Sequence, residues 1–149
     1  MRKLYMLVLA AVLFAFSPAD EVKELNGFKL INKEVSLTDF NLWVITTPEV
    51  FCQTFSPERA EAAAPDFDQE WVLAGKLRTV SGFYTIKFKR TVISKDALNV
   101  YFKIKRDKNQ VESDESVSMV LVPKNSGVRK VNFYHDEVLV RTVPIVTVF

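Results

Sequence analysis

The sequence contains one cysteine and one histidine, the two groups that a thiol-dependent hydrolase would need. If Cys52 were a nucleophile, it would need His135 within hydrogen-bonding reach and a third group to orient the imidazole. Cys52 lies in a predicted helix between Phe51 and Phe55, and such flanking aromatic residues are typical of a hydrophobic core. No thiol-hydrolase motif surrounds it. We therefore expect a buried, unreactive thiol and a histidine in a turn.

Acidic residues form two clusters that could serve acid–base or metal chemistry. Paired carboxylates do such work only when a framework fixes their separation, and both clusters fall in predicted loops, where acids are usually solvated. One histidine and one cysteine cannot complete a standard zinc site, and no glycine-rich phosphate loop is present. We expect no enzymatic activity, no metal and no cofactor. The clusters are Asp66, Asp68 and Glu70, and Glu112, Asp114 and Glu115.

Four lysines occupy alternate positions on two predicted strands. Such a stripe, with Tyr101 beside it, could hold a polyanion. More often it keeps the outer face of a sheet soluble and resistant to aggregation, and we favour that interpretation. The lysines are Lys87, Lys89, Lys103 and Lys105.

The connection between Gly75 and Tyr84 is the most informative part of the chain, because it joins two predicted strands with polar residues and a second glycine. Gly82 permits a positive φ or a close backbone approach, and the polar side chains offer hydrogen-bond donors at an exposed rim. The connection is either a structural hairpin or a recognition loop. As a recognition loop, its partner-binding residues would be Arg78, Thr79, Ser81, Gly82 and Tyr84.

The second half of the chain has the pattern of an antiparallel sheet. Apolar and lysine-rich positions alternate there with a period of two, as a sheet with one solvated face requires. Residues 94–97 are a hairpin turn in type and length, and a second hairpin turns around 135–137. Pro144 marks an edge or a bulge, because proline cannot donate to a ladder. The predicted strands are 71–74, ending at Gly75, 83–90, 98–105, 117–122, 131–134 and 138–140.

The first half of the chain predicts a short helical insertion between weaker strands at 28–35 and 42–45. Thr47 followed by Pro48 is typical of an N-cap with proline at the first helical position, which predicts a helix from Pro48 to about Phe55. Ser56 and Pro57 repeat this start signal, so a second, alanine-rich helical turn is expected at 59–64. The fold class is therefore α+β, a mainly antiparallel β-sheet or sandwich with a short helical insertion before the main strands.

Several short motifs resemble those of one known family, the PrcB C-terminal-type domain. The resemblance covers residues 66–134, about half of the chain, and Val80-Ser81 departs from the usual glycine-rich pair. It implies an extracytoplasmic accessory domain without enzymatic activity, since the family's namesake is a subunit of a surface protease complex. The motifs are Asp66-Phe67, Val72-Leu73-Ala74-Gly75, Arg78-Thr79, Ser81-Gly82-Phe83-Tyr84, Ile86, Met119-Val120-Leu121-Val122-Pro123-Lys124 and Val131-Asn132-Phe133.

The first nineteen residues have the pattern of a cleavable signal peptide. Arg2 and Lys3 precede thirteen uncharged residues, and small residues end the segment at Ala19. Thirteen residues span about 20 Å as a helix, too short for a bilayer. We expect export to the periplasm or the medium and a single β-rich domain over residues 20–149 without a membrane span. That domain has eighteen basic and eighteen acidic residues, so nothing in its net charge favours nucleic acid.

The sequence leaves three functional hypotheses. The first is a non-catalytic exported domain that engages a protein partner, with a protease or protease complex among the candidates, through the connection described above and sheet-edge pairing. The second is a small-molecule or glycan binder that uses Trp43, Trp71 and Tyr101, although aromatic residues in a domain of this size more often form core. The third, the least favoured, is the thiol hydrolase.

Overall fold

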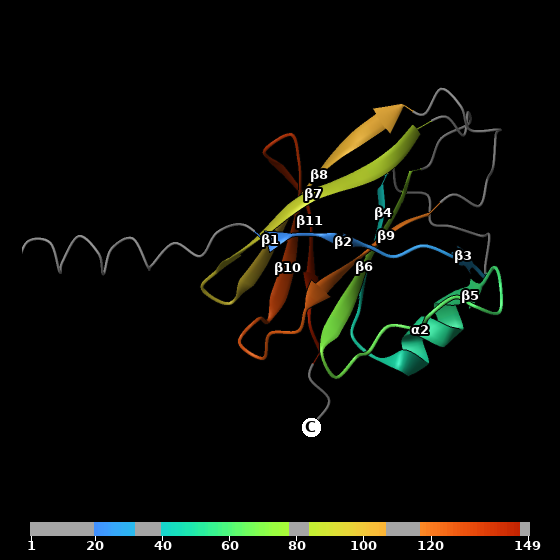
Figure 1. Cartoon of the computed structure of the whole chain (residues 1–149). Coiled ribbons are helices and arrows are strands. Elements are labelled where there is room, and N and C mark those ends of the chain that lie inside the picture. The colour runs from blue at the N-terminus through green and yellow to red at the C-terminus, as the bar shows by residue number, and fades with distance from the viewer. Residues whose placement is uncertain (1–19, 32–39, 78–83, 107–116, 147–149) are drawn as a thin grey trace, which may run out of the picture.

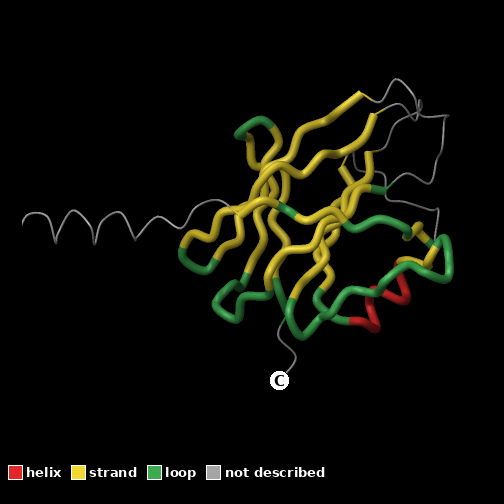
Figure 2. The backbone as a smooth tube through the Cα atoms, in the orientation of Figure 1, coloured by secondary structure: helices red, strands yellow, loops and turns green. Residues whose placement is uncertain are grey.

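The computed structural model of the chain describes residues 20–31, 40–77, 84–106 and 117–146, and strands dominate the path of its backbone (Figure 2). The predicted signal peptide lies outside these residues, as do most of the 75–84 connection and the acidic cluster at 112–115. No helix in the described ranges has the length and apolar character to cross a membrane.

One sheet, here sheet A, has five strands in the order β1-β7-β8-β10-β11 (Figure 1). Neighbouring strands are antiparallel, except that β8 and β10 run parallel. The chain reaches β10 from β8 by way of β9, which belongs to the other sheet. The strands of sheet A are β1 (Asp20–Glu21), β7 (Tyr84–Ser94), β8 (Ala97–Arg106), β10 (Lys130–His135) and β11 (Val138–Pro144).

The other sheet, sheet B, has four antiparallel strands in the order β2-β9-β6-β4. Because β2 follows β1 almost immediately, the N-terminal segment pairs first with β7 of sheet A and then with β9 of sheet B. The strands of sheet B are β2 (Lys23–Glu24), β4 (Phe40–Ile45), β6 (Glu70–Leu77) and β9 (Ser118–Pro123).

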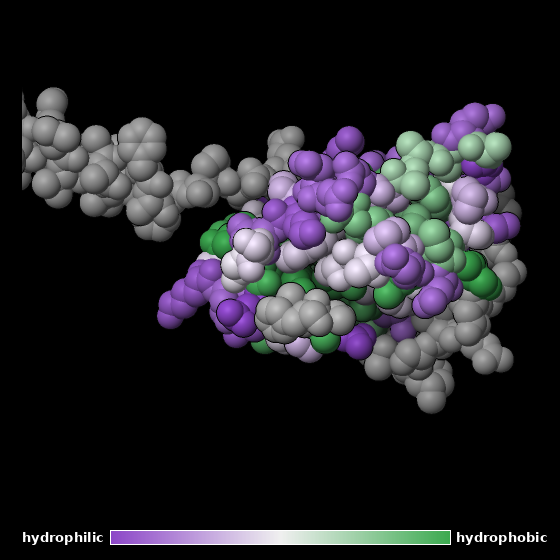
Figure 3. Space-filling model, turned by 90° about the horizontal axis from the view of Figure 1, so that it is seen from below, coloured by the Kyte–Doolittle hydropathy of each residue, from purple (hydrophilic) through white to green (hydrophobic). Residues whose placement is uncertain are grey.

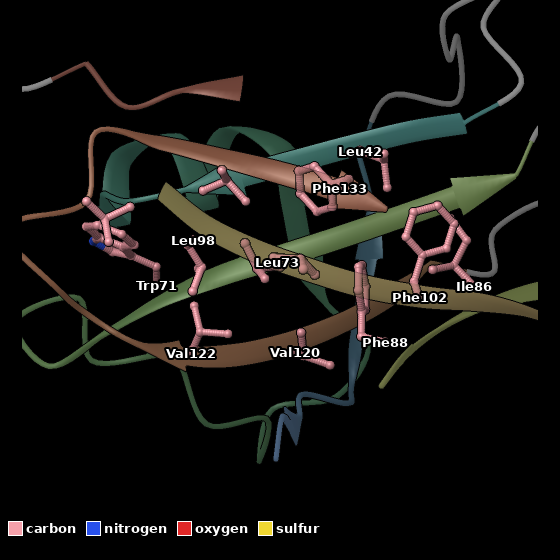
Figure 4. Close-up of a cluster of buried hydrophobic side chains, with 13 residues drawn as sticks. Leu42, Trp71, Leu73, Ile86, Phe88, Leu98, Phe102, Val120, Val122 and Phe133 are labelled. Carbon is pink, nitrogen blue, oxygen red and sulfur yellow. The ribbon is translucent and has the colours of Figure 1, made fainter. Parts of the chain in front are cut away.

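The two sheets face each other across the main hydrophobic core (Figure 4). Alternate residues of each strand point inward, as the period-two pattern predicts, and Val100, Val131 and Phe133 have no solvent-accessible surface. Trp71 is also buried in this core, as expected for a tryptophan inside an apolar run. A sandwich closed by packing alone needs such bulk, because the single cysteine can form no internal disulfide.

A small outer layer covers the other face of sheet B (Figure 1). It consists of α2 (Pro48–Thr54), β3 (Phe28–Leu30) and β5 (Phe55–Pro57), with β3 and β5 antiparallel. Phe51 and Phe55 pack together in this layer, and they join a second buried cluster that includes Val72 and Ala74 of β6. Sheet B is therefore buried on both faces, whereas no described element covers the outer face of sheet A.

The fold-class prediction is confirmed: the chain forms a mainly antiparallel sandwich with one short helix before the main strands. The predicted N-cap is also correct, since the Val50 N–H donates to Thr47 Oγ1 at 3.4 Å. Pro144 is the last residue of β11, an edge strand of sheet A. The hairpins around 94–97 and 135–137 form as predicted.

The second predicted helix, at 59–64, is wrong. Ser56 and Pro57 belong to β5, which pairs with β3, and residues 58–61 form a bend and a turn instead. The pairing of Phe55 with Leu30 holds the chain extended where the N-cap signal would have started a helix. A short alanine-rich segment has too little helical stability to compete with that pairing.

Gly75 does not end its strand, because β6 continues to Leu77. Ile86 and Phe88 of sheet A pack directly over this glycine. A Cβ atom at Gly75 would lie 2.8 Å from Ile86 Cδ1 and 3.2 Å from Phe88 Cζ. The glycine therefore serves the close approach of β6 to β7 rather than a turn.

Candidate functional site at an open sheet edge

The first half of β7 forms an edge of sheet A that no described strand covers, here called the open edge. β1 pairs only with Arg90 and Thr91, whereas β8 pairs along the whole length of β7. From Tyr84 to Phe88, no described strand lies on the side of β7 opposite β8. In an antiparallel sheet, half of the backbone N–H and C=O groups of an edge strand point away from its neighbour. These groups are available to another strand.

A β-bulge separates the covered part of β7 from the open part. Phe88 is opposite Phe102 and Arg90 is opposite Tyr101, so Lys89 is the extra residue. A bulge increases the local twist and redirects the strand beyond it. The pairing with β1 stops at Arg90, next to this bulge, and the open edge begins on its other side.

A cleft of about 350 Å³ lies beside the open edge, where sheets A and B part. Its walls come from the first part of β7, from the start of β9, from the end of β2 and the residues just after it, and from Lys105 of β8. Ile86 and Phe88 also line the cleft, and both side chains are buried. The polar groups at the cleft are Glu24, Asn26, Thr85, Lys87, Lys105 and Ser118. The volume lies at the lower end of the range of small-molecule pockets and is sufficient for one or two side chains of a bound segment.

The open edge belongs to a strongly basic pair of strands. Strands β7 and β8 together contain six basic residues and no acidic residue. Of these six, only Arg90 has an ionic partner among the described residues, Glu137 at 4.0 Å, and both side chains are exposed. The predicted lysine stripe is real, since Lys87, Lys89, Lys103 and Lys105 are all exposed.

An ordered column of side chains crosses the outer face of sheet A next to this basic region. The Arg90 guanidinium lies 4.0 Å from the centroid of the Tyr101 ring. Tyr134 stacks beside Tyr101, with centroids 5.0 Å apart and planes 17° apart. A parallel row of hydrogen bonds runs alongside, in which the Asn132 amide donates to Asn99 Oδ1 at 3.1 Å and the Thr142 hydroxyl donates to Asn132 Oδ1 at 2.8 Å.

The three aromatic residues of the glycan hypothesis are each at least partly covered by neighbouring side chains. Arg90 and Tyr134 take up the space beside the Tyr101 ring. Trp71 is 4% exposed, and Trp43 is half-buried with Phe55 against its ring at 6.3 Å. Seen from below, hydrophobic and hydrophilic residues lie side by side on the described surface (Figure 3).

The expectation that Cys52 is buried is wrong, because the thiol lies on the solvent side of α2. Phe51, its neighbour, takes the inward position instead. His135 lies at the end of β10 in sheet A, stacked on Phe102 with centroids 5.4 Å apart, and Nε2 is 3.2 Å from Asp136 Oδ2. The two residues thus belong to different layers, and no hydrogen bond between them occurs among the described residues.

The acidic cluster before β6 organises a turn. The Asp68 N–H donates to Asp66 Oδ1 at 3.0 Å, and the Asp66 N–H donates to Glu70 Oε1 at 3.4 Å. In the described ranges, no three histidine, cysteine, aspartate or glutamate side chains are placed to hold a metal ion. The second cluster, Glu112, Asp114 and Glu115, lies outside those ranges.

Of the predicted partner-binding residues, only Tyr84 is described. It begins β7 at the open edge and is 41% exposed. Arg78, Thr79, Ser81 and Gly82 lie outside the described residues. Sequence reasoning did not identify the open edge itself, because strand alternation shows which side chains point outward but not which strands lack a neighbour.

Comparison with known proteins gives no match at any of three levels. No family model matches the chain, and neither a curated protein nor a solved structure is found to match it.

Proposed function

We propose that this chain is a non-catalytic exported accessory domain that binds a protein partner by accepting an extended segment at the open edge of β7. One observation carries the proposal: among the described residues, the strand from Tyr84 to Phe88 is paired on one side only, beside a cleft of about 350 Å³. Strand addition derives affinity from backbone hydrogen bonds and specificity from the side chains that enter neighbouring pockets. It requires no catalytic group.

The sequence resemblance favours one class of protein partner. The PrcB C-terminal-type domain is an extracytoplasmic accessory domain, and the motif that carries the resemblance leads directly into β7 through Tyr84 and Ile86. A protease or a subunit of a protease complex is therefore the partner we propose to test first. The signal-peptide pattern of residues 1–19 fits a periplasmic or secreted location.

Site-specific photo-crosslinking tests the proposal. A photoreactive phenylalanine analogue replaces Tyr84, which is 41% exposed at the open edge, and in a control protein replaces Val50, which is 46% exposed on α2. Both proteins are expressed in the native host with the signal segment intact. We expect irradiation to crosslink a defined partner to position 84 and not to position 50. Equal crosslinking from both positions, or none from position 84, contradicts the proposal.

Hydrogen–deuterium exchange then tests the mode of binding. In the free protein, the outward-pointing amides between Tyr84 and Phe88 should exchange quickly, since no described group accepts from them across the open edge. Addition of the purified partner should protect them, while amides of β10, which has strands on both sides, change little. Protection confined to α2 would place the partner elsewhere.

A further inference from the structure

The basic charge of the strands β7 and β8 is only partly balanced by acidic residues among the described ones, namely Glu137 beside Arg90, Glu21 opposite Arg90 and Glu24 in the cleft. From residue 20 onward the chain has equal numbers of acidic and basic residues, yet these two strands carry only basic ones. Five of the six form no ion pair with any described residue. The six are Lys87, Lys89, Arg90, Lys103, Lys105 and Arg106.

Two of these lysines are directly opposite each other. Lys87 and Lys103 are register partners across β7 and β8, and both are exposed. Like charges in this position destabilise a sheet. Solubility alone does not require such a pair, since lysine opposite glutamate would keep the face equally polar at lower cost. An anionic ligand on this face would remove the repulsion.

We infer that the segment accepted at the open edge is acidic, an extended stretch of a protein partner in which carboxylate side chains occupy alternate positions. This inference rests on the proposed function. Side chains at alternate positions of an added strand would lie on the same face as Lys87 and Lys103, and those opposite Lys87 would come within about 5 Å at their Cβ atoms. Each carboxylate would then meet lysines that have no ionic partner among the described residues.

The other face of the added strand would point into the cleft between the sheets. Asn26, Thr85 and Ser118 line it, so small hydroxyl side chains can enter and form hydrogen bonds there. The partner segment therefore alternates acidic and small polar residues. Two copies of this chain paired through β7 would instead bring two rows of lysines together, which disfavours self-association at this edge.

Synthetic peptides test the inference. The probe alternates glutamate and threonine over about seven residues, the usual length of a strand. Controls of the same length replace glutamate with lysine, or place proline at every third position to prevent strand pairing. Fluorescence anisotropy at low and high salt measures binding to the domain. We expect the glutamate peptide to bind with an affinity that falls as salt rises, and the two controls not to bind.

Variants of the domain link binding to the lysines. We expect Lys87→Gln to weaken the glutamate peptide about threefold, the size of one exposed ion pair, and Lys103→Glu to weaken it about tenfold, because a charge is reversed rather than removed. Lys103→Glu also relieves the repulsion of Lys87, so its melting temperature should not fall. Weaker binding with retained stability then cannot be attributed to unfolding. Lys29→Gln, an exposed lysine on β3 in the outer layer, is the matched control.

Three outcomes overturn the inference. If the proline peptide or heparin binds as tightly as the glutamate peptide, the face attracts any polyanion and strand addition is not involved. If the lysine variants bind the peptide as the unaltered domain does, the basic face is not the determinant. If the crosslink from position 84 survives unchanged in the Lys87→Glu, Lys103→Glu protein, the proposed partner binding stands and only its acidic character is wrong.

Discussion

Tyr101 and Tyr134 stack face to face across the parallel strands β8 and β10, with ring centroids 5.0 Å apart. Both lie on the outer face of sheet A, because their neighbours Val100 and Phe133 point into the core. Both are half-buried. Cross-strand aromatic pairs contribute to stability through such contacts, so this stack stabilises the face that carries the basic charge.

Removal of Tyr134 should therefore destabilise the sandwich. We expect Tyr134→Ala to lower the free energy of unfolding by about 1 to 2 kcal/mol, through the lost ring burial and the lost stacking on Tyr101. Urea denaturation followed by fluorescence measures it. Tyr84→Ala, at the end of a strand and without a ring contact among the described residues, should cost less than about 0.5 kcal/mol. Equal losses in the two variants would show that the stack contributes nothing.

Gly75→Ala should destabilise the contact between the two sheets. The new Cβ would meet Ile86 Cδ1 at 2.8 Å, closer than carbon atoms can approach, and Phe88 Cζ at 3.2 Å. Overpacking of this kind costs about 1 to 3 kcal/mol, and the loss should appear in urea denaturation. We also expect a weaker photo-crosslink at position 84, because Ile86 and Phe88 hold the open edge in place.

A second substitution makes this prediction specific. Ile86→Val removes the Cδ1 atom that the alanine would strike and by itself costs about 1 kcal/mol. In the double variant the clash is smaller. Its loss in free energy of unfolding should therefore be smaller than the sum of the losses of the two single variants, by about 0.5 kcal/mol or more. Simple additivity would show that the Cβ is accommodated by a backbone shift rather than resisted by Ile86.

Thr47→Ala tests the start of α2. The Thr47 side chain accepts from the Val50 N–H, and the Phe51 N–H donates to the Thr47 carbonyl at 3.1 Å. Loss of the side-chain cap should cost about 1 kcal/mol in thermal or urea unfolding. Thr47→Ser keeps the hydroxyl and should stay within about 0.5 kcal/mol of the unaltered protein. An equal loss for serine would mean that the methyl group, and not the cap, is what matters.

The strands of the second half could be predicted from the sequence because each has one buried and one solvated face. Ile86 and Phe88 alternate with Lys87 and Lys89, and this pattern alone fixes a period of two. The N-cap at Thr47 could also be predicted, because it depends only on Thr47 and the residues directly after it. The helical turn predicted at 59–64 is wrong because its start signal is local, whereas the competing interaction is not. β5 pairs with β3, more than twenty residues earlier.

The candidate site was harder to predict because it depends on the order of strands. The sequence indicates Tyr84 as part of a recognition loop and not as the first residue of the open edge. Because the N-terminal segment is split between β7 and β9, no described strand covers that edge, and nothing in residues 20–24 indicates such a split. The parallel pairing of β8 with β10, which brings Tyr134 beside Tyr101, is likewise invisible to periodicity.

The exposed Cys52 gives a prediction that separates an accessible thiol from a catalytic one. Because the residue is on the solvent side of α2, Ellman's reagent should label it in the native protein about as fast as in the unfolded chain. Alkylation is therefore no evidence for a hydrolase. Cys52→Ser should change the free energy of unfolding by less than about 0.5 kcal/mol and leave the crosslink at position 84 intact. If labelling requires unfolding, the thiol is shielded, and if Cys52→Ser abolishes partner capture, α2 belongs to the binding surface.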